Sequence, residues 1–375
     1  MKTKLVSAIA LLAIGASSAQ GVSYEYRRLY KDAKIMGAGG ANVASGGSFG
    51  ALFSNPAGLA KIPQEYGWEF QVANIGVAVN DNIRDLSDII DDAEESESKA
   101  ADTLKEHIGD RYNIDLNVIE FSIAKKFDQA AFGLGAVTSA NVNFAVHQGF
   151  GASGVLESEI LAVVGAAGGF AYDFNDLTIG SYALNTLSVG VGAKALRYGY
   201  LNRTFSAADL ANEEFENIDD EIEEGNAFVG DIGVIYDVFP NFAIGLSALN
   251  IGGIGEGALE IPATVNVGAS YVYRVADRSF FNQVRVGADY IDLAGAYEDS
   301  SYVKRTSFGA DLNVWDGWFS TFAVQAGLYQ GKWTAGANLR LSLVDLSFAT
   351  YAEELGAYAG QDGDRRYMAS FGFNW

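Results

Sequence analysis

Alternation of polar and apolar side chains is the sequence feature that most constrains the fold of this chain. From Glu65 onward it occurs in blocks of about ten residues separated by turn residues. Three clear blocks are ATVNVGASYVYR (263–274), QVRVGADYI (283–291) and WTAGANLRLSL (333–343). Because successive side chains of a β-strand point to opposite faces, each block predicts a strand with one polar and one apolar face.

A soluble β-sandwich and a membrane β-barrel would both alternate in this way, and three features favour the barrel. Aromatic residues make up 13% of the chain and gather near block ends, as interfacial girdles do. No apolar segment reaches the roughly 20 residues of a membrane-spanning helix. The prolines lie outside the blocks, as a closed ladder requires: they are Pro56, Pro63, Pro240 and Pro262. We therefore expect an all-β fold, a transmembrane antiparallel β-barrel.

The blocks predict about 14 strands, an even number as in single-chain bacterial outer-membrane barrels. Twelve or sixteen also remain open, since block boundaries are uncertain by several residues. The connection at residues 175–186 is longer than an inner turn should be. The predicted strands are 65–79, 111–127, 132–147, 155–174, 186–201, 226–238, 242–251, 263–274, 283–295, 303–314, 319–330, 333–344, 346–354 and 366–375.

The first 19 residues have the pattern of a secretory signal peptide. Lys2 and Lys4 precede an apolar run from Leu5 to Ile14, and small residues lie before Gln20. The apolar run is too short to span a bilayer. We expect cleavage before Gln20 and export from the cytoplasm. The chain has no cysteine, which excludes a disulfide framework and a thiolate metal site.

The net charge of −22 is concentrated in two segments. Residues 81–110 carry eleven acidic and three basic side chains, and residues 206–225 carry nine acidic and none. This sign excludes nucleic-acid binding. If the N-terminus is periplasmic, both segments are outer loops, and the apolar spacing in 81–110 predicts amphipathic helices on the barrel mouth. Neither segment has the spacing of a calcium-binding loop. We therefore expect their acidic side chains to form a solvated face, with loosely held divalent ions as the alternative.

The last strand, RRYMASFGFNW, places alternate aromatic residues on one face and ends on another aromatic residue. Phe371, Phe373 and Trp375 resemble the C-terminal signal that outer-membrane barrels present to the barrel-assembly machinery.

A glycine-rich stretch, MGAGGANVASGG, precedes SFGALFSNPAGLAKI (48–62) near the start of the chain. It has neither the spacing of a phosphate-binding loop nor a strand before it. Asn55, Pro56 and Ala57, with MGAGGANVAS before them and GLA after them, resemble the N-terminal hatch of FadL/TodX-type outer-membrane transport proteins. The same start occurs in a wider set of barrels, including F-plasmid-TraF-like chains and PorV-type secretion partners. The passage LNIGG…IPATVNVGASY (249–271) also resembles that set.

This resemblance implies the domain organisation and location of the chain. Residues 20–63 would form a hatch inside the lumen, and residues 64–375 would form the barrel. The protein would be integral to the outer membrane of a Gram-negative bacterium, in contact with its lipid and lipopolysaccharide.

Charged residues on the polar face of the strands would line the lumen and hydrogen-bond the hatch. These are Arg274, Arg285, Asp289, Arg305, Asp311 and Arg340. The second predicted strand breaks its alternation at Val118–Phe121, which predicts a β-bulge. The fourth is apolar on both faces and would suit an apolar pocket.

Three functions are open to a chain of this kind. The resemblance implies a channel for passive uptake of small hydrophobic molecules, either long-chain fatty acids or hydrocarbons. The second possibility is a non-transporting barrel that docks partners in a secretion or conjugation system. The third, a barrel enzyme, needs a histidine base, and the only candidates, His107 and His147, fit solvated positions better. We therefore expect no catalytic, metal or cofactor-binding residues.

Overall fold

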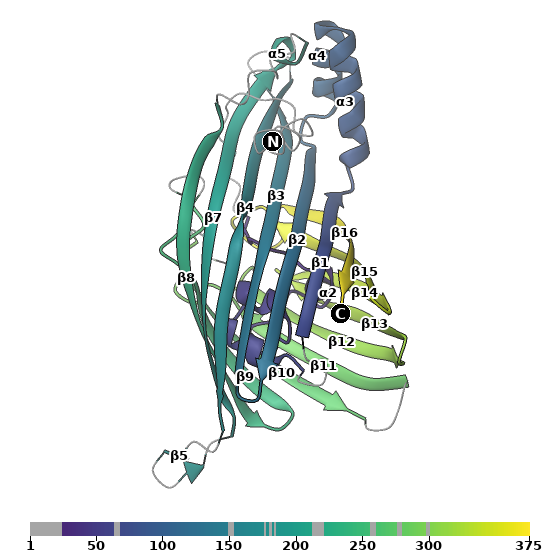
Figure 1. Cartoon of the computed structure of the whole chain (residues 1–375). Helices are drawn as coiled ribbons and strands as arrows, with labels where there is room; N and C mark the ends of the chain where they lie inside the picture. Colours follow the sequence, from purple (N-terminus) through teal and green to yellow (C-terminus); the bar gives the residue numbers. More distant parts are fainter. Residues whose placement is uncertain are drawn as a thin grey trace.

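The computed structural model describes residues 25–63, 68–148, 154–175, 178–179, 182–183, 185–211, 221–255, 260–275, 280–297 and 301–375. Fourteen of their strands form one closed antiparallel barrel (Figure 1). The expected all-β transmembrane barrel is confirmed, including its fourteen strands. Residues 1–19, where we expect the signal peptide, lie outside the described part of the chain.

The barrel strands pair with their neighbours along the chain, and β1 pairs with β16 to close the ring, with Gln71 opposite Asn374. The strands are β1 (Trp68–Asn80), β2 (Arg111–Phe127), β3 (Ala130–Gln148), β4 (Gly154–Phe174), β7 (Leu187–Ser206), β8 (Glu223–Phe239), β9 (Phe242–Ile251), β10 (Thr264–Arg274), β11 (Phe280–Tyr290), β12 (Thr306–Asp316), β13 (Ser320–Tyr329), β14 (Lys332–Leu341), β15 (Val344–Glu354) and β16 (Gly363–Asn374).

The wall is much taller on one side than on the other. Strands β2, β3, β4, β7 and β8 are 17 to 21 residues long, whereas β9 to β16 are 10 to 12. Figure 1 shows the long strands rising beyond the rest of the barrel on one side. We call this part the tall wall.

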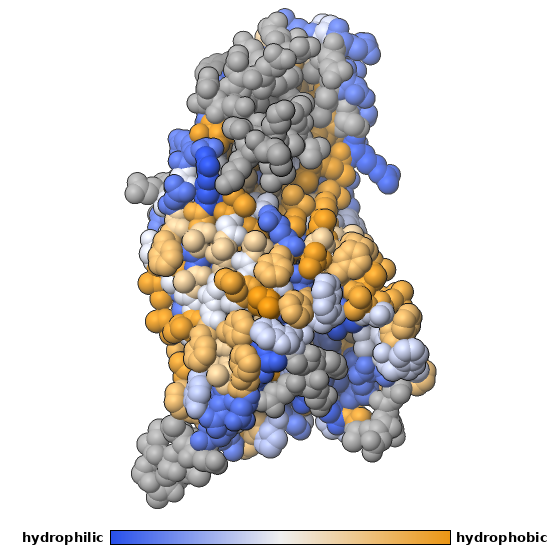
Figure 2. Space-filling model, viewed as in Figure 1, coloured by the Kyte–Doolittle hydropathy of each residue, from blue (hydrophilic) through white to orange (hydrophobic). Residues whose placement is uncertain are grey.

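Alternation decides which side chains face outward. On β10, Val267 is 37% exposed whereas its neighbour Asn266 is 4% exposed and points inward. In Figure 2, hydrophobic residues (orange) gather across the middle of the visible face, and hydrophilic residues (blue) lie toward its ends. At the end near the C-terminus, Trp68 packs edge to face with Phe127 and Phe132, and Phe70 stacks on Trp375. This is the apolar band with an aromatic girdle that a lipid bilayer requires.

Within the described residues, none of the helices has the length and apolar character needed to cross a membrane.

The bulge predicted in the second strand is present. The pairing of β2 with β3 shifts register between Ile119 and Phe121, so Glu120 is the extra residue. Strand β1 shifts at the same level, where Ala73 has a φ of 49°. The side chains of β2 therefore change face at this point, which explains the break in alternation.

The first acidic segment forms two helices, α3 (Ile83–Glu95) and α4 (Glu97–Glu106), and the second begins with α5 (Ala207–Ala211). We expected helices on the barrel mouth, but they lie on the outer face of the tall wall (Figure 1). Ile89, Leu104 and Leu210 pack there against outward-facing Phe144 and Phe205. The tall wall keeps its apolar outer face beyond the bilayer, and the helices cover that face from water. Residues 212–220 of the second segment lie outside the described part.

The long connection between β4 and β7 contains a small two-stranded sheet at the opposite end of the barrel. Its strands are β5 (Thr178–Ile179) and β6 (Tyr182–Ala183). This sheet accounts for the unexpected length of the connection.

Candidate functional site in the barrel lumen

The lumen is occupied by the segment Glu25–Pro63, which we call the N-terminal segment. It contains the helix α2 (Ala33–Gly37) and two 3₁₀ helices, η1 (Phe49–Phe53) and η2 (Pro56–Lys61). Figure 1 shows it as the purple coil enclosed by the strands. Helix α2 contacts β13 to β16, whereas η1 and η2 contact the tall wall. A barrel of this size has a lumen that wall side chains alone do not fill, so a chain segment fills it.

Small residues let the N-terminal segment approach the wall at backbone distance. A Cβ on Gly37 of α2 would lie 2.9 Å from the Cα of Gly336 on β14. A Cβ on Gly190 of β7 would overlap the backbone of Ala57. The glycine-rich stretch is therefore explained by close packing against the strands, not by phosphate binding.

Asn55 fixes the corner between η1 and η2. Its side chain is buried and its amide nitrogen donates to the carbonyl oxygens of Val43, Val234 and Leu246, at 2.8, 3.1 and 3.3 Å. Its side-chain oxygen accepts from the backbone N–H of Ala57 at 3.1 Å, which caps η2, and Pro56 occupies the first position of that helix. The predicted Asn55-Pro56-Ala57 corner is thus tied to β8 and β9, and its role in a hatch stays a prediction.

An apolar cluster holds η1 and η2 against the tall wall. Phe49, Leu52 and Leu59 are essentially buried and pack with Val137 and Ala167. Lys61 adds an ion pair with Asp237 of β8, at 2.7 Å. Because apolar burial and an ion pair act together, this half of the N-terminal segment is firmly attached to the wall.

A buried ion cluster holds the beginning of the segment. Lys31 lies 3.0 Å from Asp115 of β2 and 3.1 Å from Glu353 of β15. Arg366 of β16 lies 2.9 Å from Glu25 and 3.0 Å from Asp115. All five side chains are at most 5% exposed, so each charge depends on the others for stabilisation.

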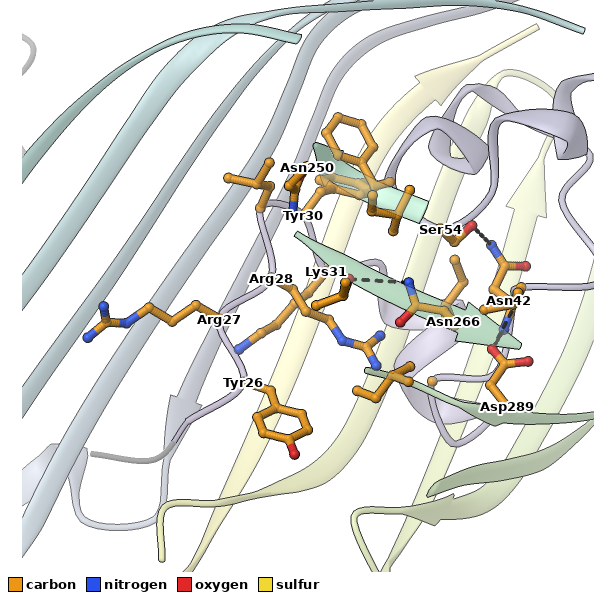
Figure 3. Close-up of a pocket in the computed structure, with 18 of the residues that line it drawn as sticks. Tyr26, Arg27, Arg28, Tyr30, Lys31, Asn42, Ser54, Asn250, Asn266 and Asp289 are labelled. Carbon is orange, nitrogen blue, oxygen red and sulfur yellow. Dashed lines mark hydrogen bonds between the residues drawn. The ribbon is translucent and has the colours of Figure 1, made fainter. Parts of the chain in front are cut away.

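Helix α2 separates two cavities. One, of about 100 Å³, lies toward the tall end, and Figure 3 shows most of the residues that line it. The other, of about 820 Å³, lies toward the C-terminal aromatic girdle, and we call it the vestibule. Asp32, Ile35 and Asn42 line both cavities, so the stretch Asp32–Asn42 is the partition between them.

The partition is attached to the short side of the barrel at several points. Lys34 pairs with Asp345 of β15 at 2.8 Å, and Thr334 of β14 donates to the carbonyl of Gly37 at 2.8 Å. At its far end, Asp289 of β11 accepts from the backbone N–H groups of Asn42 and Val43. Gly39 and Gly40 have φ angles of 71° and 78°, which favour glycine.

Two of the six predicted lumen residues contact the N-terminal segment. Asp289 does so through Asn42 and Val43, and Arg305 donates to the hydroxyl of Tyr26 at 3.1 Å. Three others bond to wall residues on neighbouring strands: Arg340 with Asp345, Asp311 with Gln325 and Arg274 with Gln283. The sixth, Arg285, lines the vestibule.

Sequence reasoning missed the residues that hold the segment most strongly. Glu25, Lys31, Asp115, Glu353 and Arg366 come from four distant parts of the chain. Each occupies an inward-facing position of its strand or the start of the segment. The sequence does place charged residues at inward-facing positions of β2, β15 and β16. It does not indicate which of these charges pair, because their strands become neighbours only when the barrel closes.

The two histidines pair with carboxylates away from the cavities. His107 Nδ1 lies 2.9 Å from Asp110, and His147 Nε2 lies 2.8 Å from Glu157. Among the described residues, no group of three His, Cys, Asp or Glu side chains is arranged to hold a metal ion.

Residues 52–281 match the family described as "F plasmid transfer operon, TraF, protein". No curated protein matches the chain significantly. Among the solved structures that share its fold are three with TM-scores of 0.52 to 0.56. The toluene transporter TbuX of Ralstonia pickettii is 14% identical, with a TM-score of 0.55, and covers 93% of this chain and 99% of its own. The P. putida toluene transporter TodX is 13% identical, with a TM-score of 0.52, and the match covers 93% of this chain and 99% of TodX.

A TodX monoaromatic hydrocarbon channel with a deltaS2 mutation is 12% identical, with a TM-score of 0.56, and covers 95% of this chain and 100% of its own. These proteins are described as transporters or a channel rather than enzymes, in agreement with the expectation from the sequence. The shared fold and the apolar outer band place the chain in the outer membrane of a Gram-negative bacterium.

Proposed function

Because the chain belongs to the TraF family of the F plasmid transfer operon and shares its fold with toluene transporters, we propose that it is a passive channel for small hydrophobic molecules. The observation that supports this most is the pair of cavities on the two sides of the partition Asp32–Asn42. On this side of the lumen, the short partition Asp32–Asn42 lies between the two cavities.

The lining of the smaller cavity suits apolar cargo. Leu29, Ile35, Met36, Val43 and Phe53 contribute apolar surface beside seven charged side chains and several uncharged polar ones. In a ligand pocket the apolar part supplies affinity and the polar groups fix orientation. Small hydrocarbons fit a cavity of about 100 Å³ better than long-chain fatty acids do.

Passage requires the partition to move, because it separates the cavities. The tall-wall half of the segment is held by buried apolar contacts, whereas the partition is held by single polar contacts and backbone packing. We propose that α2 shifts while η1 and η2 stay in place. A cargo molecule would then pass from the smaller cavity to the vestibule and leave at the girdle end.

A disulfide across the partition tests this proposal in a chain that has no natural cysteine. A Cβ on Gly287 would lie 3.3 Å from the Cβ of Ala41, close to the separation of bridged cysteines, about 3.5–4.5 Å. In liposomes, the oxidised double variant Ala41→Cys and Gly287→Cys should lose toluene flux, and reduction should restore it.

A matched control joins two strands without touching the segment. A Cβ on Gly76 of β1 would lie 3.6 Å from the Cβ of Ser370 on β16. Oxidation of the variant Gly76→Cys and Ser370→Cys should leave flux unchanged. If wild type conducts no solute, or if the Ala41–Gly287 bridge leaves flux unaltered, the channel proposal fails.

A second candidate is a barrel that docks partners of a conjugation or secretion system. The family description favours it, as does the tall wall, which presents acidic helices beyond the apolar band. Under this alternative, wild type would conduct nothing in liposomes, and removal of α3 and α4 would abolish partner binding without affecting the barrel. We also propose that Phe371, Phe373 and Trp375 are recognised by the barrel-assembly machinery, and that the outer band contacts lipid and lipopolysaccharide.

A further inference from the structure

The smaller cavity carries one more positive than negative side chain. Its charged lining consists of four cations and three carboxylates: Arg27, Arg28, Lys31, Lys194, Asp32, Asp289 and Asp292.

Three of the cations pair with a carboxylate that does not itself line the cavity. Arg27 pairs with Glu159 of β4, Lys31 with Asp115 at 3.0 Å, and Lys194 with Asp231 at 2.6 Å. In Figure 3, Arg27 accordingly extends away from the strands that carry Asn266 and Asp289.

The three carboxylates of the lining accept hydrogen bonds from backbone N–H groups. Asp32 accepts from the backbone N–H groups of Lys34 and Ile35 and caps α2. Asp289 accepts from two backbone N–H groups of the N-terminal segment. Asp292 accepts from the backbone N–H groups of Ala296 and Tyr297 at 2.8 and 3.1 Å.

Arg28 is the exception. Its guanidinium stands over the ring of Tyr329, 5.0 Å from the centroid, but has no ion pair or hydrogen bond with any described residue. In Figure 3 its side chain extends into the pocket on the side of Asn266 and Asp289. An arginine always carries its charge and has five N–H donors. Asp289 and Glu353 attract this half-buried guanidinium without an ion pair or hydrogen bond, so its donors stay available and favour binding of an anion.

The size and lining of the cavity restrict the anion. A cavity of about 100 Å³ admits only a small ligand. Leu29, Met36 and Phe53 would contact a short apolar tail. The additional negative charges of a polyanion would be repelled by Asp289 and Asp292. A single carboxylate accepts two parallel hydrogen bonds from a guanidinium.

We propose that Arg28 binds the carboxylate of a small monocarboxylic acid of about three to five carbon atoms, with its tail against Leu29, Met36 and Phe53. This assignment of a ligand class rests on the proposed channel function, since it concerns the same lumen. It adds a charged, short-chain ligand to the neutral hydrocarbons suggested by the fold.

Calorimetry on the purified full-length protein in detergent tests the proposal, with butyrate as probe and butyramide as its neutral isostere. Wild type should bind butyrate about ten- to a hundredfold more tightly than butyramide, because butyramide cannot form the charged pair. This comparison needs no variant, so it remains decisive even if a substitution at Arg28 disturbs folding.

The variant Arg28→Gln should lose the preference for butyrate, and Arg28→Lys should retain part of it. The control Arg197→Gln should bind butyrate as wild type does, because Arg197 lies in an exposed pair with Glu224. Equal affinity for butyrate and butyramide, no binding of butyrate, or unchanged binding in Arg28→Gln would overturn the assignment.

Flux measurements separate this inference from the channel proposal. If toluene crosses liposomes but butyrate does not bind, the channel stands and the role of Arg28 is wrong. If butyrate binds through Arg28 but no solute crosses, the binding site stands and the channel proposal is wrong.

Discussion

Arg366 donates to both carboxylate oxygens of Glu25, at 2.9 and 3.1 Å, although the two residues are 341 positions apart. Both side chains are buried in the lumen, and Asp115 also accepts from Arg366 at 3.0 Å. The last strand of the barrel thus holds the first described residue of the N-terminal segment.

The variant Arg366→Met should loosen the N-terminal segment strongly. It leaves Glu25 and Asp115 with fewer counter-charges in a buried site, and breaking a buried pair costs about 3–5 kcal/mol. Urea unfolding in lipid vesicles and proteolysis of the segment would measure this loss. The neighbour Arg365 faces outward over Trp333, so Arg365→Met should cost about 0.5–1 kcal/mol. Equal effects of the two variants would contradict the role of the buried cluster.

Acid should release the segment through Glu25. Burial raises the pKa of this carboxyl, but Arg366 and Lys31 together lower it by more than burial raises it. The pKa of Glu25 therefore lies well below its ordinary value of 4.5. The ionised form is therefore favoured in the folded state, and this stabilisation is present above pH 4.5 and lost progressively as the pH falls below it.

Protease sensitivity of the segment should thus be constant between pH 8 and about pH 5 and increase in more acidic solution. The variant Glu25→Gln should be more sensitive at neutral pH and should lack most of this acid dependence. An identical pH profile for wild type and variant would show that other carboxylates control release.

Opposite faces of β15 should respond differently to a new charge. Phe348 is 49% exposed on the lipid face, and Phe348→Arg should destabilise the barrel by about 2–4 kcal/mol near the bilayer midplane. Ser347 lines the vestibule, where an arginine side chain reaches water, so Ser347→Arg should cost much less. Unfolding titrations of both variants in the same lipid measure the difference. A larger cost at Ser347 would mean that the faces are assigned the wrong way round.

Replacing Phe373 and Trp375 together with alanine should lower the amount of protein assembled in the outer membrane. Phe70 donates its N–H to the carbonyl of Trp375 at 2.7 Å and stacks on its ring, so these residues also close the seam between β1 and β16. Quantifying heat-modifiable protein in outer-membrane fractions measures assembly. Wild-type levels in the double variant would show that the aromatic ending is incidental.

The sequence was sufficient for the features that depend on local periodicity. Alternation along each block determines the face of residues such as Val267 and Asn266, and the break at Glu120 marks a bulge because one extra residue reverses the pattern. The strand number followed from the same pattern, since each block between turn residues forms one strand.

Features that depend on closure of the barrel could not be predicted in this way. Nothing near Arg366 in the sequence indicates that Glu25 is its partner, and nothing near Arg28 indicates that it lacks one. The helices of residues 81–110 were recognised from their apolar spacing. Their position on the outer wall depends on the length of β2 to β7, which the block boundaries underestimated for β7.

Single-channel conductance in planar bilayers is the most direct test of the central claim, that the N-terminal segment closes the lumen. Wild type and a variant lacking residues 22–62 would be compared after both are shown to migrate as folded, heat-modifiable barrels. We predict a nearly closed wild type and a stable open pore in the variant, because this segment fills the lumen between the tall wall and β13 to β16. Equal conductance of the two folded proteins would contradict the claim.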